Sequence, residues 1–144
     1  MDANNIDRIL CIDYGEKRIG IAVSDPLRLF AIPVTTIKND KNLWKNLIQL
    51  LDDYNVKKIV LGYPLSENGQ KSNSTLMVEK FKGELEKRVK TEIVLFDERY
   101  SSLIAKDIII KIVSSKKKRR NKELLDKASA AVILEDYLKF SDNK

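Results

Sequence analysis

The chain has 144 residues, of which 43% are hydrophobic, so it can bury a substantial core and has the usual size of a single compact domain, residues 1–144. It contains no histidine, which excludes Ser-His-Asp and Cys-His catalysis, histidine zinc sites and histidine general bases. Its 27 basic and 21 acidic residues give a net charge of +6, which favours a polyanionic partner.

The single cysteine, Cys11, lies inside an apolar run and has no partner for a disulfide or a thiolate metal site. A reducing cytoplasm is therefore the expected compartment, and Cys11 is expected to be a small core residue. No apolar stretch approaches the length of a membrane span, so we expect a soluble cytoplasmic protein without a membrane partner.

The first half of the chain predicts a meander of strands followed by a helix. Residues 8–13 and 19–24 form a hairpin around a glycine-containing turn, and residues 31–38 add a third strand. Apolar residues then recur at helical spacing over 41–55, which predicts an amphipathic helix. A short apolar strand is expected at 58–61.

The second half alternates loops, helices and one strand. Residues 62–69 contain two glycines and a proline, which predict a loop at a strand end. Helices are expected at 74–90, 103–113 and 122–139, and a fifth strand at 92–96. The last helix is predicted because six residues share one helical stripe: Leu124, Ala128, Ala131, Val132, Glu135 and Leu138.

The resulting order, βββαβαβα, predicts an α/β fold with a mixed five-stranded sheet and helices on both faces. This is the element order of the ribonuclease H-like fold. In open α/β sheets, ligands gather beyond the carboxyl ends of strands where the strand order reverses. Polar side chains at those ends are therefore the candidates for a functional site.

Three carboxylates stand at such positions. Asp13 closes the first strand, Glu98 follows the fifth strand, and Asp126 opens the last helix. If folding brings them together, they form an oxygen cage for two Mg²⁺ or Mn²⁺ ions about 4 Å apart, which can drive phosphodiester hydrolysis without histidine. Asp13 is the candidate to bridge both ions, while Glu98 and Asp126 would each hold one.

Basic and aromatic residues flank these carboxylates. Lys17, Arg18 and Arg99 are candidates for phosphate contacts, and Gly15 would allow a sharp turn beside Asp13. An unpaired base could stack on one of three tyrosines: Tyr14, Tyr63 or Tyr100. A dense basic run adds a further candidate surface for nucleic acid, or else a solvated loop: Lys116, Lys117, Lys118, Arg119 and Arg120.

Four segments together resemble the YqgF (RuvX-like) family over nearly the whole chain: Asp13-Tyr14-Gly15-Glu16-Lys17-Arg18-Ile19-Gly20, Gly62-Tyr63-Pro64-Leu65, Asp97-Glu98-Arg99-Tyr100-Ser101-Ser102 and Asp126-Lys127-Ala128. Members of that family are described as ribonuclease H-like relatives of the Holliday-junction resolvase RuvC, and as nucleases that mature the 5′ end of pre-16S ribosomal RNA. The resemblance implies an acidic triad of Asp13, Glu98 and Asp126. It also implies that Arg99 and the loop from Gly62 to Gly69, with Tyr63 and Pro64, line the site.

The expected function is therefore a metal-dependent nuclease acting on RNA in preference to DNA, with pre-ribosomal particles as a further partner. A DNA junction resolvase would need a symmetric dimer, whereas RNA trimming needs one active site, so both a monomer and a homodimer stay open. A non-catalytic RNA-binding assembly or transcription factor is the alternative from another class. An actin-like ATPase is a weaker one, because its nucleotide lies between two such domains.

Overall fold

The computed structural model describes residues 6–98 and 122–142, and in the second range it describes the side chains of residues 128–141. The elements within these ranges follow the expected order: β1 (Arg8–Asp13), β2 (Arg18–Ser24), β3 (Ala31–Lys38), α1 (Leu43–Asp53), β4 (Val56–Tyr63), α2 (Asn73–Arg88), β5 (Glu92–Asp97) and α4 (Lys122–Asp142). The helix expected at 103–113 lies outside the described residues.

The strands form one five-stranded sheet in the order β3-β2-β1-β4-β5. β1 pairs antiparallel with β2, and β2 antiparallel with β3, as expected for the meander. β1 pairs parallel with β4, and β4 parallel with β5. The carboxyl ends of β1, β4 and β5 therefore meet at one edge of the sheet.

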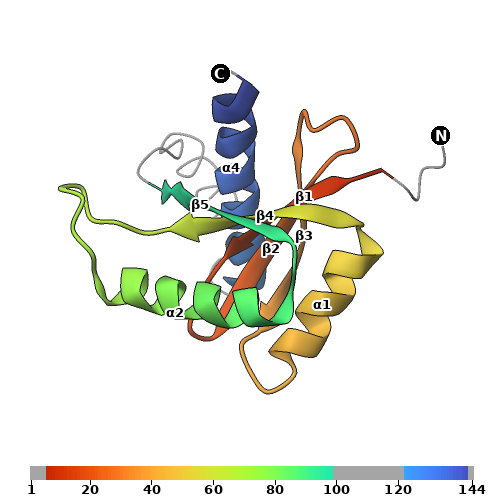
Figure 1. The fold of residues 1–144 in the computed structure, drawn as a ribbon. Coiled ribbons are helices and arrows are strands. Elements are labelled where there is room, and N and C mark those ends of the chain that lie inside the picture. The colour runs from red at the N-terminus through yellow and green to blue at the C-terminus, as the bar shows by residue number, and fades with distance from the viewer. Residues whose placement is uncertain (1–5, 99–121, 143–144) are drawn as a thin grey trace.

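Helices cover both faces of this sheet, as expected (Figure 1). Side chains alternate along β1, so Leu10 and Ile12 join the core cluster under α1 and α2, whereas Ile9 and Cys11 join the cluster under α4. Cys11 is fully buried, as predicted for a core residue. The mixed sheet with two covered faces confirms the predicted fold class.

Three members of the stripe expected on α4, Ala131, Val132 and Leu138, are buried, but burial on this helix extends beyond that stripe. The buried residues include five consecutive positions, so the helix is covered on more than one side there: Ala130, Ala131, Val132, Ile133, Leu134 and Leu138. The physical reason is that α4 packs across three strands of the sheet, β1, β2 and β3, which widens its buried side. Neither α4 nor any other helix in the described ranges is long and apolar enough to cross a membrane.

The fourth strand is longer than predicted. The sequence predicts that it stops at residue 61, with Gly62 and Tyr63 in a loop, but both belong to β4. Gly62 pairs with Phe96, and Tyr63 pairs with Asp97 of β5. Gly62 and the nearby Pro64 indicate that the strand ends before them, but pairing with β5 continues the strand to Tyr63. The loop proper begins at Pro64.

Candidate functional site

The predicted site lies at the edge where three parallel strands end. Asp13 is the last residue of β1, Tyr63 the last of β4, and Glu98 directly follows β5. The register aligns Ile12 with Leu61, so Asp13 lies beside Gly62 in the next row of the sheet. β1 and β5 flank β4 on opposite sides, so Glu98 must reach across β4 to approach Asp13.

The side chain of Glu98 lies over Gly62. A Cβ atom added at Gly62 would stand 3.3 Å from Cδ of Glu98 and 3.2 Å from Cδ1 of Ile133 in α4. The Glu98 carboxyl group therefore lies on the α4 face of β4, one strand away from Asp13. Neighbouring strands are about 4.8 Å apart.

The pKa of the buried Cys11 thiol is affected by both carboxylates, which places both of them near Cys11. Burial raises its pKa well above the ordinary value, and the negative charges of Asp13 and Glu98 raise this pKa further. Cys11 and Asp13 are two residues apart in β1 and therefore share the α4 face. Two of the three predicted carboxylates thus converge on the same side of the sheet.

The third predicted carboxylate belongs to α4, but its side chain lies outside the described residues. Asp126 lies four and seven positions before Ala130 and Ile133, and both of those residues are fully buried. Residues at these spacings lie along one side of a helix. Participation of Asp126 stays a prediction.

The donor set that the structure describes suits a hard divalent cation. Asp13 and Glu98 offer carboxylate oxygens, which Mg²⁺ and Mn²⁺ prefer, and Asp13 is held at the end of a central strand. Because Gly62 has no side chain, the carboxyl group of Glu98 can lie directly over it. Both carboxylates are of the ligand type that the predicted metal needs, and a third carboxylate must come from outside the described side chains, because these form no group of three possible ligands.

The turn between β1 and β2 is held by Asn39, whose role sequence patterns did not reveal. Its side-chain amide donates to the carbonyl oxygen of Gly15 at 2.9 Å and to the Tyr14 hydroxyl at 3.1 Å, while its backbone N–H donates to the carbonyl oxygen of Lys17. A Cβ at Gly15 would collide with the carbonyl oxygen of Arg18. The sharp turn predicted for Gly15 therefore does require glycine.

A cavity of about 400 Å³ lies between this turn and the first turns of α2. Four residues predicted to take part in the site line it: Tyr14, Gly15, Lys17 and Pro64. Arg18 does not line the cavity; it follows Lys17 as the first residue of β2 and pairs with Lys38 of β3. The cavity lies on the α1 and α2 side, whereas the carboxylate of Glu98 lies on the α4 side of the same edge.

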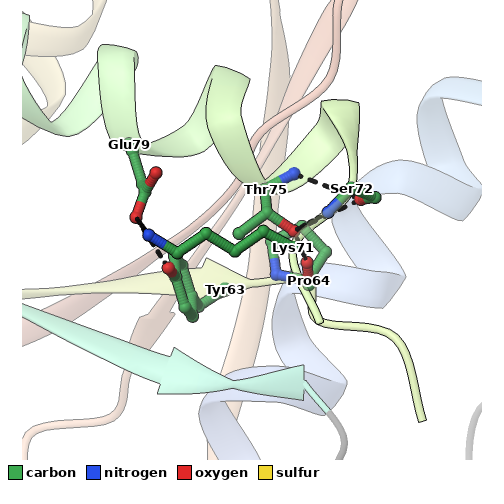
Figure 2. A network of polar contacts seen from close by, with 6 residues as sticks. All are labelled: Tyr63, Pro64, Lys71, Ser72, Thr75 and Glu79. Atoms are coloured by element: carbon green, nitrogen blue, oxygen red, sulfur yellow. Dashed lines mark hydrogen bonds and ion pairs between the residues drawn. The ribbon is translucent and has the colours of Figure 1, made fainter. Parts of the chain in front are cut away.

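Tyr63 points towards α2, where it joins a polar network (Figure 2). Its hydroxyl donates to Oε2 of Glu79 at 2.7 Å, and Nζ of Lys71 lies 2.8 Å from the same oxygen. The hydrogen bonds from Lys71 and then Tyr63 hold the pKa of Glu79 below its ordinary value. The network fastens the loop after β4 to the helix that follows it. Sequence reasoning missed Lys71 and Glu79, since no motif marks them.

The remaining predicted residues lie outside the described ranges. They are the basic and aromatic positions after Glu98 and the basic run: Arg99, Tyr100, Lys116, Lys117, Lys118, Arg119 and Arg120. Their proposed contacts with nucleic acid stay predictions.

Residues 7–140 match the RuvX family, which is described as "Holliday junction resolvase". A protein of Chlorobaculum tepidum named "Putative pre-16S rRNA nuclease" is 41% identical over 96% of this chain and 97% of its own length. A protein of the same name from Salinibacter ruber is 42% identical over 91% of this chain and 92% of its own.

Among solved structures, RuvC of T. thermophilus in complex with a Holliday junction substrate is similar with a TM-score of 0.53, over 92% of this chain and 95% of that one. The sequence identity is 13%, so this likeness bears on the fold, and it supports the ribonuclease H-like class. Together with the family match over almost the whole sequence, these findings establish that the chain belongs to the RuvX family.

Proposed function

We propose that this chain is a divalent-metal-dependent nuclease that processes the 5′ end of pre-16S ribosomal RNA. The observation that carries the proposal is the convergence of Asp13 and Glu98 on one face of the sheet edge, within a member of the RuvX family. The names of the relatives at about 40% identity point to the same substrate.

In this proposal Asp13 and Glu98 hold the cation, with Asp126 as the third ligand. A bound divalent cation polarises a phosphate oxygen and lowers the pKa of its water, which supplies the chemistry that histidine supplies elsewhere. Asp13 contributes rigidity, because β2 pairs with β1 through Asp13 and β4 pairs with β1 through Ile12. Glu98 contributes a carboxyl group placed across β4.

The RNA strand is proposed to run along the part of this sheet edge that carries Lys17 and Arg18. Lys17 is exposed on the β1–β2 turn beside the cavity, and Arg18 opens β2. Both would contact phosphates, and the basic run at 116–120 would extend the contact to more distant parts of the RNA. Structured leader RNA on a pre-ribosomal particle suits such a broad, charge-based contact.

The second candidate function is resolution of DNA junctions, which the description of the RuvX family favours. It requires two coordinated cuts and therefore a symmetric dimer. Sedimentation of the purified chain with and without a four-way junction separates the two functions, because resolution demands two copies on one junction.

The test is cleavage of end-labelled substrates by the wild type and by Asp13→Asn, with Mg²⁺, Mn²⁺ or EDTA. The panel holds pre-16S leader RNA, unstructured RNA, duplex DNA and a four-way DNA junction. We expect metal-dependent cutting of leader RNA that Asp13→Asn lowers by a factor of about 1,000 or more while RNA binding persists.

Asp52→Asn is the matched control, since Asp52 is an exposed carboxylate near the end of α1, and this variant should cut like the wild type. If the wild type cuts the four-way DNA junction in preference to leader RNA, junction resolution replaces RNA processing as the proposed function. Tight RNA binding without cleavage of any substrate would turn the assignment to a non-catalytic assembly factor.

A further inference from the structure

Gly62 lies inside a strand, where glycine lowers the stability of the fold. It lies within β4, a strand paired on both sides, and pairs with Phe96 of β5. Its φ angle is outside the left-handed region, so the backbone conformation is open to any residue. Glycine inside a strand weakens it and often marks a close approach by another group. The reason for glycine here must therefore be space.

The space above Gly62 is shared by two side chains from distant parts of the chain. Glu98 places Cδ at 3.3 Å and Cγ at 3.5 Å from a Cβ built at Gly62, and Ile133 places Cδ1 at 3.2 Å. Ile133, a residue of α4, is fully buried, whereas Glu98 is only partly buried. A methyl group at Gly62 would press on both side chains, and Glu98, the more exposed of the two, has more room to move.

We propose that Gly62 is a positioning residue: its missing side chain lets the Glu98 carboxylate lie across β4, close enough to Asp13 for both to bind one cation. The inference rests on the proposed metal site and deepens it. On one side Gly62 pairs with Phe96 of β5. On the other side the preceding pair is Leu61 with Ile12, so Gly62 lies beside Asp13 of β1. A carboxylate above Gly62 is about one strand spacing, 4.8 Å, from the backbone of Asp13.

The experiment compares Mn²⁺ affinity by calorimetric titration, together with the melting temperature in EDTA, for full-length variants. Gly62→Ala should weaken Mn²⁺ binding by about tenfold or more, as removal of a group that orients a metal ligand does. Gly83→Ala is the matched control, because a Cβ at this α2 position meets nothing within 4 Å, and it should bind Mn²⁺ like the wild type.

Glu98→Ala separates positioning from a general structural effect. In that background Gly62→Ala should weaken Mn²⁺ binding no further, and its effect on the melting temperature should shrink, because the obstructed carboxyl group is gone. Ile133→Val should restore part of the melting temperature of Gly62→Ala without restoring its Mn²⁺ affinity. If Gly62→Ala does not fold, recovery of folding in the double variant with Glu98→Ala supports the same contact.

Wild-type Mn²⁺ affinity in Gly62→Ala, or an equal further loss in the Glu98→Ala background, would overturn the inference and leave the metal site standing. Absence of Mn²⁺ binding by the wild type would overturn the proposed metal site and this inference together. A double variant that stays as unfolded as Gly62→Ala would also contradict the proposed contact.

Discussion

At the scale of single residues, Asp25 shows how one carboxylate can shape a turn. Its side chain accepts hydrogen bonds from the backbone N–H groups of Leu27 at 3.0 Å, Leu29 at 2.7 Å and Phe30 at 2.6 Å. Arg28, between them, has a φ of 59°, which costs energy outside glycine. Asp25 thereby holds the β2–β3 turn in one conformation.

The pKa of Asp25 predicts acid sensitivity of this turn. Desolvation is the largest single influence and raises the pKa, but the backbone hydrogen bonds from Phe30, Leu27 and Leu29 together outweigh it and lower the pKa below its ordinary value. The ionised side chain therefore stabilises the fold at neutral pH, and that contribution disappears as the pH falls through the folded-state pKa.

Asp25→Ala should lower the free energy of unfolding by about 1 kcal/mol near neutral pH and by less near pH 3. Urea denaturation at both pH values checks this, with Glu67→Ala as a control for removal of an exposed carboxylate. An equal loss of stability at both pH values would mean that the charge of Asp25 plays no part.

At the scale of elements, the start of α2 is fixed by a reciprocal pair of side chains. Ser72 Oγ accepts from the backbone N–H of Thr75, and the Thr75 hydroxyl accepts from the backbone N–H of Ser72 at 3.0 Å. The same hydroxyl donates to the carbonyl oxygen of Pro64 (Figure 2). Thr75 is fully buried, so it ties the helix to the end of β4.

Thr75→Val should therefore lower the free energy of unfolding by about 1–3 kcal/mol, because it keeps the shape and leaves two backbone groups without their hydroxyl partner. Chemical denaturation of Thr75→Val and Thr75→Ser is the measurement. Thr75→Ser retains the hydroxyl and removes only a methyl group, so it should be the milder change. The reverse ranking would assign the role of Thr75 to packing.

At the scale of the whole molecule, the net charge of +6 predicts a strong salt dependence of RNA binding. Replacing the five basic residues at 116–120 by glutamine should reduce affinity and also flatten the plot of log affinity against log salt. The slope should change by roughly 0.7 for each phosphate of single-stranded RNA that the variant no longer neutralises. Filter binding at several salt concentrations measures it, and an unchanged slope would identify the run as a solvated loop.

The order of elements and the edge that carries the site follow from the sequence. Alternation and helical spacing reflect local burial, so they predicted every described strand and helix, and carboxylates after strands marked Asp13 and Glu98. Element ends were less predictable, because pairing with β5 extended β4 through Gly62 and Tyr63. The stripe predicted on α4 included the buried Ala131 and Val132 but not Ala130, Ile133 and Leu134, which are buried because α4 packs across three strands.

By itself, then, the amino-acid sequence determined the fold class, the residue types available for chemistry and the exclusion of histidine mechanisms. The tertiary structure alone decided what meets at the sheet edge: Glu98 over Gly62, Asn39 on the β1–β2 turn, and Lys71 with Tyr63 on Glu79. The physical reason is that these contacts join residues far apart in the sequence. Periodicity records which side of an element is buried, whereas these contacts join residues that only the crossing of strands and helices brings together.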